Sequence, residues 1–138
     1  MKFKLKFWEP DYYVNEAKGT VTCVLKFRLG GVIGSKKDED AFKAVRYVTE
    51  SVYGEDNPIS YNYSVTETAK LDPKDTFNAE IGKKVARAKA ESSAYKFCSK
   101  ILTKSIEKFT FNLASAAANF IKKASGVVVH NKRYLEQF

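Results

Sequence analysis

The side chains whose types and spacing could do chemistry in this sequence are mainly cations. Between residues 81 and 108, eight basic side chains face only two acidic ones, a net of six positive charges. Cations at this density can contact successive phosphates and release their counterions. The candidate contacts are Lys83, Arg87, Lys89, Lys96, Lys100, Lys104 and Lys108. The alternative is that they form the ordinary solvated face of an amphipathic helix, although such faces usually mix both signs of charge.

A second group of candidates lies on alternating positions of predicted strands. It comprises Lys2, Lys4, Lys6, Trp8, Lys26, Arg28 and Lys70. If these side chains share the polar face of one sheet, charge and aromatic stacking together could hold single-stranded nucleic acid. Two alternatives stay open: lysines on an edge strand also prevent aggregation, and Trp8 could fold over the rim of the core.

Catalytic and metal-binding constellations are not found in the sequence. His130 is the single histidine, and the widely spaced Cys23 and Cys98 fall within apolar patterns that indicate buried thiols. The acidic residues 38–40 suit the first turn of a helix, where negative charge favours the helix dipole. Residues 30–34 lack the glycine spacing of a phosphate-binding loop. We therefore expect no catalytic residue, no cofactor and no metal, and the protein is not expected to be an enzyme.

The elements that position these residues follow from hydrophobic periodicity. Strict alternation predicts strands over residues 2–8, 20–29 and 59–71, and a three-and-four repeat predicts a helix over residues 38–53. We expect Pro10 and Asp11 to end the first strand, and the Gly30-Gly31 pair to mark a turn. A longer helix is expected after Asp75 or Thr76, either of which could cap it.

The long helix carries most of the basic candidates. Its apolar stripe comprises Phe77, Ile81, Val85, Ala88, Tyr95, Leu102, Ile106, Phe109, Leu113, Ala117, Phe120 and Ile121. A straight helix of about 45 residues would be about 65 Å long, too long for one small domain, so we expect a break near residues 109–112. Gly126 would close the second helix, and residues 127–129 could add a short final strand.

A smaller set of apolar residues lies on the lysine side of this helix, outside the stripe. It comprises Ala86, Ala90, Ala94, Phe97 and Ile101. Either a neighbouring element packs on them, or they form a surface for a protein partner.

Length and composition indicate a single domain over residues 1–138. The chain has 138 residues, 44% hydrophobic and 29% charged, and a net charge of +8. We predict an α+β fold: an antiparallel sheet of three to four strands with helices on one face, in the order β-β-α-β-α-α. No apolar run reaches the length of a membrane span, so no membrane contact and a cytoplasmic location are expected.

The segment Lys70–Tyr95, KLDPKDTFNAEIGKKVARAKAESSAY, resembles a pattern found in small uncharacterised accessory proteins of phages and prophages of Gram-positive bacteria. The resemblance implies a phage-borne accessory protein that acts by binding, in the cytoplasm of a host cell. Our leading hypothesis is a non-catalytic protein that binds nucleic acid through the basic helix or the sheet face. The alternatives are a counter-defence inhibitor, anti-CRISPR-like, that binds a host nucleic-acid-handling complex, and a binder of small anionic nucleotides. Whether the chain forms a homo-oligomer is left open.

Overall fold

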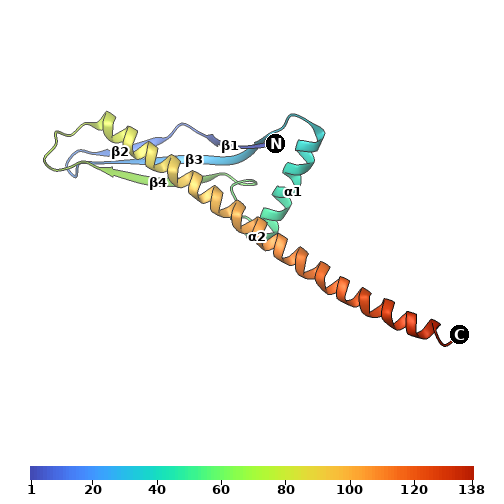
Figure 1. Cartoon of the computed structure of the whole chain (residues 1–138). Helices are drawn as coiled ribbons and strands as arrows, with labels where there is room; N and C mark the ends of the chain where they lie inside the picture. Colours follow the sequence, from blue (N-terminus) through green and yellow to red (C-terminus); the bar gives the residue numbers. More distant parts are fainter.

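A four-stranded antiparallel sheet carries two helices on one face, in a computed structural model that describes residues 1–138 (Figure 1). The elements follow in the order β1 (Lys2–Phe7), β2 (Asp11–Asn15), β3 (Thr20–Val32), α1 (Lys36–Tyr53), β4 (Tyr63–Lys70) and α2 (Ala79–Leu135). The predicted α+β class is confirmed. The predicted order lacked one strand, β2, and contained one helix too many.

The long strand β3 lies at the centre of the sheet. One of its edges pairs first with β2, from Asn15 opposite Thr20, and then with β1, up to Lys2 opposite Val32. Its other edge pairs with β4. The first strand ends before Pro10, as predicted, but a second strand that was not predicted, β2, begins at Asp11. Pairing resumes at Asp11, because β1 and β2 follow one another along the same edge.

The predicted turn at the Gly30-Gly31 pair is also wrong, because both glycines stay in β3 opposite Lys4 and Phe3. Gly31 permits a close approach of α1, since a Cβ built at this position would lie 2.7 Å from the ring of Phe42. The contact places α1 on the same face of the sheet as α2.

The predicted third strand is shorter than expected and begins at Tyr63 instead of residue 59. The preceding residues form a turn in which the side-chain oxygen of Asn57 accepts hydrogen bonds from the backbone N–H groups of Ile59 and Ser60, at 3.2 and 2.9 Å. Asn57 is fully buried, so this turn is part of the core.

Small residues of α2 pack against large residues of the sheet. Alternate side chains of β3, from Val21 to Leu29, are buried, and the opposing residues of α2 are Gly82, Ala86, Ala90, Ala94 and Cys98. The predicted stripe was therefore assigned to the wrong side of the helix: Ile81 is 52% exposed and Tyr95 57%. The valine, leucine and phenylalanine side chains of β3 already fill the space between the layers, so the helix contributes short side chains there. The small apolar residues on the lysine side of α2, such as Ala86, Ala90 and Ala94, therefore pack against the sheet.

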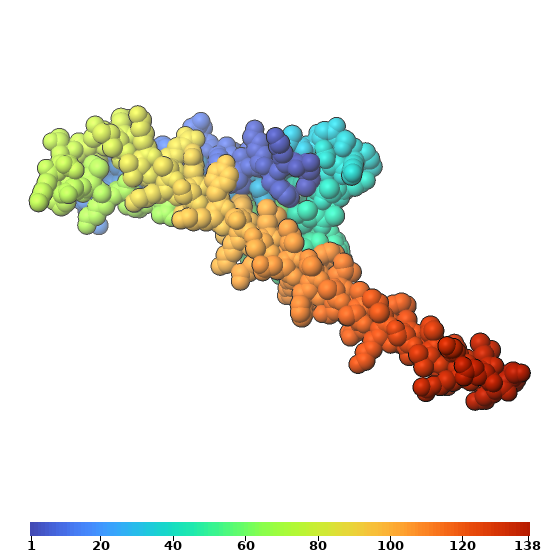
Figure 2. Space-filling model, viewed as in Figure 1, coloured from blue at the N-terminus to red at the C-terminus, as the bar shows by residue number.

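The helix α2 is continuous over 57 residues and begins at an Asn78 cap, in place of Asp75 or Thr76. The expected break near residues 109–112, the stop at Gly126 and the strand over residues 127–129 were all wrong. The segment 113–124 contains five alanines and no proline, and one glycine costs only about 1 kcal/mol in a helix. The helix instead accommodates its length by leaving the body of the molecule, as the orange and red segment of Figure 2 shows.

Candidate nucleic-acid interface

The outer face of the sheet gathers the lysines of β1 and β3. Because residues paired across antiparallel strands share a face, Lys6 lies beside Arg28 and Lys4 beside Gly30. The buried residues of β3 are the odd-numbered ones, so Lys26 and Arg28 point away from the helices. Lys2, Lys4, Lys6 and Lys26 are all exposed. The structure therefore brings most of the second predicted group onto one surface, with Lys70 at its far end, opposite Thr20.

Trp8 lies within this cationic surface. The ammonium of Lys6 stands 4.9 Å from the centre of the Trp8 ring, within the range of a cation–π interaction. The backbone N–H of Trp8 donates to the carbonyl of Lys26 at 3.1 Å, which holds the bend between β1 and β2 against the central strand. Trp8 is half-buried, so it remains partly accessible to solvent.

Tyr13 is a second aromatic side chain on this face, and it was not among the residues predicted from the sequence. It pairs with Thr22 in the ladder and is 63% exposed. The residue was overlooked because β2 was not predicted, although the run Asp11–Asn15 contains two tyrosines and a valine, which favour strands. The outer face therefore presents two rings, with Val24 between them in the sheet register.

Arg28 has a structural use that reduces its availability for a ligand. Its guanidinium donates to the backbone carbonyls of Ile59 and Ser60, both at 3.2 Å. These bonds fasten the turn before β4 to the sheet. Arg28 contributes charge to the outer face, but two of its donors are already occupied.

The cations at the start of α2 are paired with other side chains. Lys83 lies 3.5 Å from Glu80 and 5.6 Å from the centre of the Tyr12 ring. Arg87 donates to Glu91 at 3.0 Å, and this hydrogen bond raises the pKa of the guanidinium. Two of the seven predicted helix candidates are therefore already paired within the protein.

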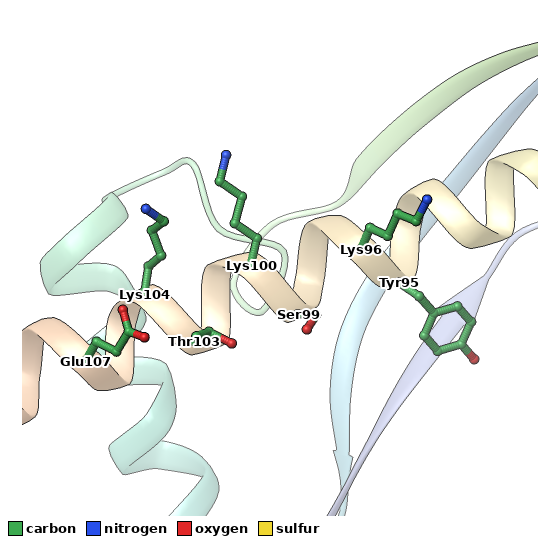
Figure 3. Close-up of a pocket in the computed structure, with 7 residues that line it drawn as sticks. All are labelled: Tyr95, Lys96, Ser99, Lys100, Thr103, Lys104 and Glu107. Carbon is green, nitrogen blue, oxygen red and sulfur yellow. The ribbon is translucent and has the colours of Figure 1, made fainter.

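Three lysines further along α2 form a row on one side of the helix. Lys96, Lys100 and Lys104 point to the same side in Figure 3, spaced four residues or about 6 Å apart, while Tyr95 points away from them. Lys89 precedes the row but donates to the backbone carbonyl of Thr68 at 3.3 Å. Lys108 lies beyond it, near the end of α1. This row is cationic and open, and the one ring that lines the same hollow, Tyr95, points away from the three lysines.

The cysteines and the acidic residue Asp38 are buried or held by contacts within the protein. Cys23 and Cys98 are buried free thiols, and burial raises the pKa of Cys98 to about 12. Asp38 accepts a hydrogen bond from the backbone N–H of Gly34 and lies 3.2 Å from the N-terminal ammonium. No three side chains of His, Cys, Asp or Glu lie close enough together to hold a metal ion. Neither helix is long and apolar enough to cross a membrane.

Comparisons of the chain with protein-family models, with curated protein sequences and with solved structures found no match.

Proposed function

We propose that this protein is a non-catalytic binder of single-stranded nucleic acid, and that the strand lies across the outer face of the sheet. The observation that carries the proposal is the lysine ladder of β1 with Trp8 at its end, on a face that neither helix covers. Proteins that bind single strands combine these two features: cations that follow the phosphates and rings on which bases stack.

The spacing of the outer face suits an extended polymer. Side chains two residues apart on a strand are about 6.7 Å apart, so Lys2, Lys4 and Lys6 form a regular row of positive charge. In the sheet register, Trp8 lies near Lys26 and Tyr13 lies opposite Thr22, about 13 Å along the sheet. Bases stacked on the two rings would leave room for intervening nucleotides above Val24.

The lysine row on α2 supports the proposal less well. Lys96, Lys100 and Lys104 offer charge, but the Tyr95 ring that lines the same hollow points away from them. A strand bound there would be held by electrostatic attraction alone. This row is therefore the appropriate control surface: it has similar charge and exposure, lies on another element, and is predicted to matter less.

The experiment is a fluorescence-anisotropy titration of labelled single-stranded DNA and RNA at several salt concentrations. Each lost phosphate contact should reduce the slope of log K against log salt by about 0.7, which corresponds to about fivefold in affinity at 0.1 M salt. The double variant Lys4→Gln/Lys6→Gln should therefore bind about 25-fold more weakly.

The matched control is Lys100→Gln/Lys104→Gln, which removes the same charge from α2. It should retain affinity to within about threefold, since it loses only long-range attraction. Absence of binding at low salt would contradict the proposal. Greater weakening by the control than by the sheet variant would move the site to the helix.

A further inference from the structure

The second half of α2 is a helical arm that extends beyond the sheet, and only its first turns lie beside another element, α1. We define the arm as residues 106–135. Every side chain from Ile106 to Leu135 is exposed except Ala124, which is half-buried. Figures 1 and 2 show the segment leaving the body as a single helix. Helices in proteins are stabilised mainly by packing of an apolar face, so an uncovered arm of this length implies a partner.

The arm has one continuous apolar seam. Its large members are Ile106, Phe109, Leu113, Phe120 and Val127, which are between 44% and 70% exposed. With Ala116, Ala117 and Ala124 between them, these positions fall within about 100° of the helix circumference. The seam continues the apolar stripe of the sequence that the sheet leaves uncovered.

The spacing of the seam positions is the same in both directions along the helix. Successive seam positions are 3, 4, 3, 1, 3, 4 and 3 residues apart, a spacing that is symmetric about the midpoint between Ala116 and Ala117. Two antiparallel copies related by a twofold axis at this midpoint would align all their seam positions.

We propose that a second copy of this chain packs antiparallel along the arm. The symmetric register places Ile106 opposite Val127 of the second copy, Phe109 opposite Ala124 and Leu113 opposite Phe120. The two alanines meet at the centre, where the absence of larger side chains lets the helices approach closely. Each phenylalanine of one copy then has an alanine or leucine beneath it, which keeps the layers similar in volume.

The charges of the arm favour antiparallel over parallel pairing. Residues 109–135 contain Lys122, Lys123, Lys132 and Arg133 and no acidic side chain. Parallel copies would bring each lysine beside its own counterpart. In the antiparallel register Lys122 lies level with residue 111 of the other copy, about 16 Å along the axis from the other Lys122. That separation exceeds the Debye length of about 8 Å at physiological ionic strength, so the repulsion is largely screened.

The apolar area is close to what a specific dimer requires. Phe109 is 44% exposed and Phe120 is 70% exposed. At about 200 Å² per ring, they leave roughly 230 Å² per chain to bury. Ile106, Leu113 and Val127 expose roughly a further 150 Å² of apolar surface per chain. Two copies together therefore offer roughly 750 Å² of apolar surface for burial. The alanines and flanking stems bring the total towards the ~1,000 Å² expected of a biological interface.

The first test is the mass of the full chain by sedimentation equilibrium across a concentration series. We expect a reversible species of twice the chain mass. Leu113→Gln and Phe120→Gln should each weaken its formation by at least about tenfold, because each change acts in both copies. The matched control is Phe111→Gln, which changes an equally exposed ring outside the seam. Circular dichroism shows whether the variants keep their helix.

The orientation is tested with a short bis-maleimide crosslinker. Ala124→Cys chains alone should not crosslink, because the two cysteines would lie about 22 Å apart in the antiparallel register. A mixture of Ala124→Cys and Thr110→Cys chains should crosslink, since in this register the two positions differ in level by one residue, about 1.5 Å along the axis. The native thiols should react slowly because both are buried.

Several results would overturn this inference. A monomer at all concentrations, or a dimer that the seam variants leave intact, would refute pairing through the arm. Self-crosslinking of Ala124→Cys would show a parallel pair. Binding of the monomer to anionic lipid vesicles, lost in Phe120→Gln, would show that a membrane surface occupies the seam instead.

Discussion

Replacing Gly82 by alanine should destabilise the protein, although the change normally strengthens a helix. Gly82 is buried where α2 crosses β3, and a Cβ built at this position would lie 2.5 Å from Cγ2 of Val21 and 3.2 Å from its Cβ. Val21 is itself fully buried and β-branched, so it has little freedom to move aside.

The magnitude follows from two opposing terms. Alanine in place of glycine favours a helix by about 1 kcal/mol, whereas an extra methyl group in a packed core costs about 1–3 kcal/mol. The expected net loss is about 1 kcal/mol of unfolding free energy. In a Val21→Ala background the obstructing methyl groups are absent, so the same Gly82→Ala change should stabilise by up to about 1 kcal/mol. The coupling energy between the two positions is then about 2 kcal/mol.

The assay is urea unfolding of the four proteins in this cycle, followed by circular dichroism. Gly126→Ala is the matched control, since a Cβ there would meet nothing within 4 Å, and it should increase helix content. Stabilisation of the otherwise wild-type chain by Gly82→Ala would refute the close packing of α2 on β3. It would favour a helix rotated to bury its larger apolar stripe.

Three further predictions concern a cap, a thiol and a carboxylate. Asn78→Ala should cost about 1 kcal/mol in urea unfolding, because the Asn78 side chain accepts from two backbone N–H groups at the start of α2. Cys98 should react with a thiol reagent only as fast as the protein unfolds, because burial raises its pKa to about 12; rapid labelling of the folded protein would contradict this. The hydrogen bond from Gly34, followed by the N-terminal ammonium, lowers the pKa of Asp38. Ionised Asp38 should therefore stabilise the fold fully at pH values above the ordinary titration range of carboxyl groups. This stabilisation should be lost as the pH falls through the lowered pKa of Asp38. Asp38→Asn should remove that part of the pH dependence of the unfolding free energy.

Periodicity in the sequence was sufficient to predict most of the fold. Alternation in β1 and β3 identified the strands and assigned their faces correctly, because one face of an antiparallel sheet is buried and the other is solvated. The three-and-four repeat of α1 gave its extent to within two residues. These signals are local, so they do not depend on what packs against each element.

The face of α2 could not be predicted in the same way. Its largest apolar side chains indicated one side of the helix, whereas the sheet selected the small residues Ala86, Ala90 and Ala94. Which side is buried depends on the volume already filled by β3, a property of two elements that are far apart in sequence. The same limit applied to Tyr13, which joins the outer face only through a strand whose pairing depends on a bend at residues 8–10.

The helix break was predicted from the expected size of the domain, with no support from a local signal. Residues 109–112 contain no proline or glycine, and the apolar pattern continues through them. The local evidence therefore favoured one helix throughout. In the proposed dimer the arm packs against a second molecule, which a single sequence does not display.

The emission of Trp8 during titration with a single-stranded oligonucleotide tests the proposed function most directly. Trp8 belongs to the proposed surface and is the one tryptophan of the chain, so its signal reports on that surface alone. We predict saturable quenching as bases stack on the ring, reversed by salt and shifted to higher oligonucleotide concentration in Lys4→Gln/Lys6→Gln. Unchanged Trp8 emission under conditions where anisotropy shows binding would contradict the outer face of the sheet as the site.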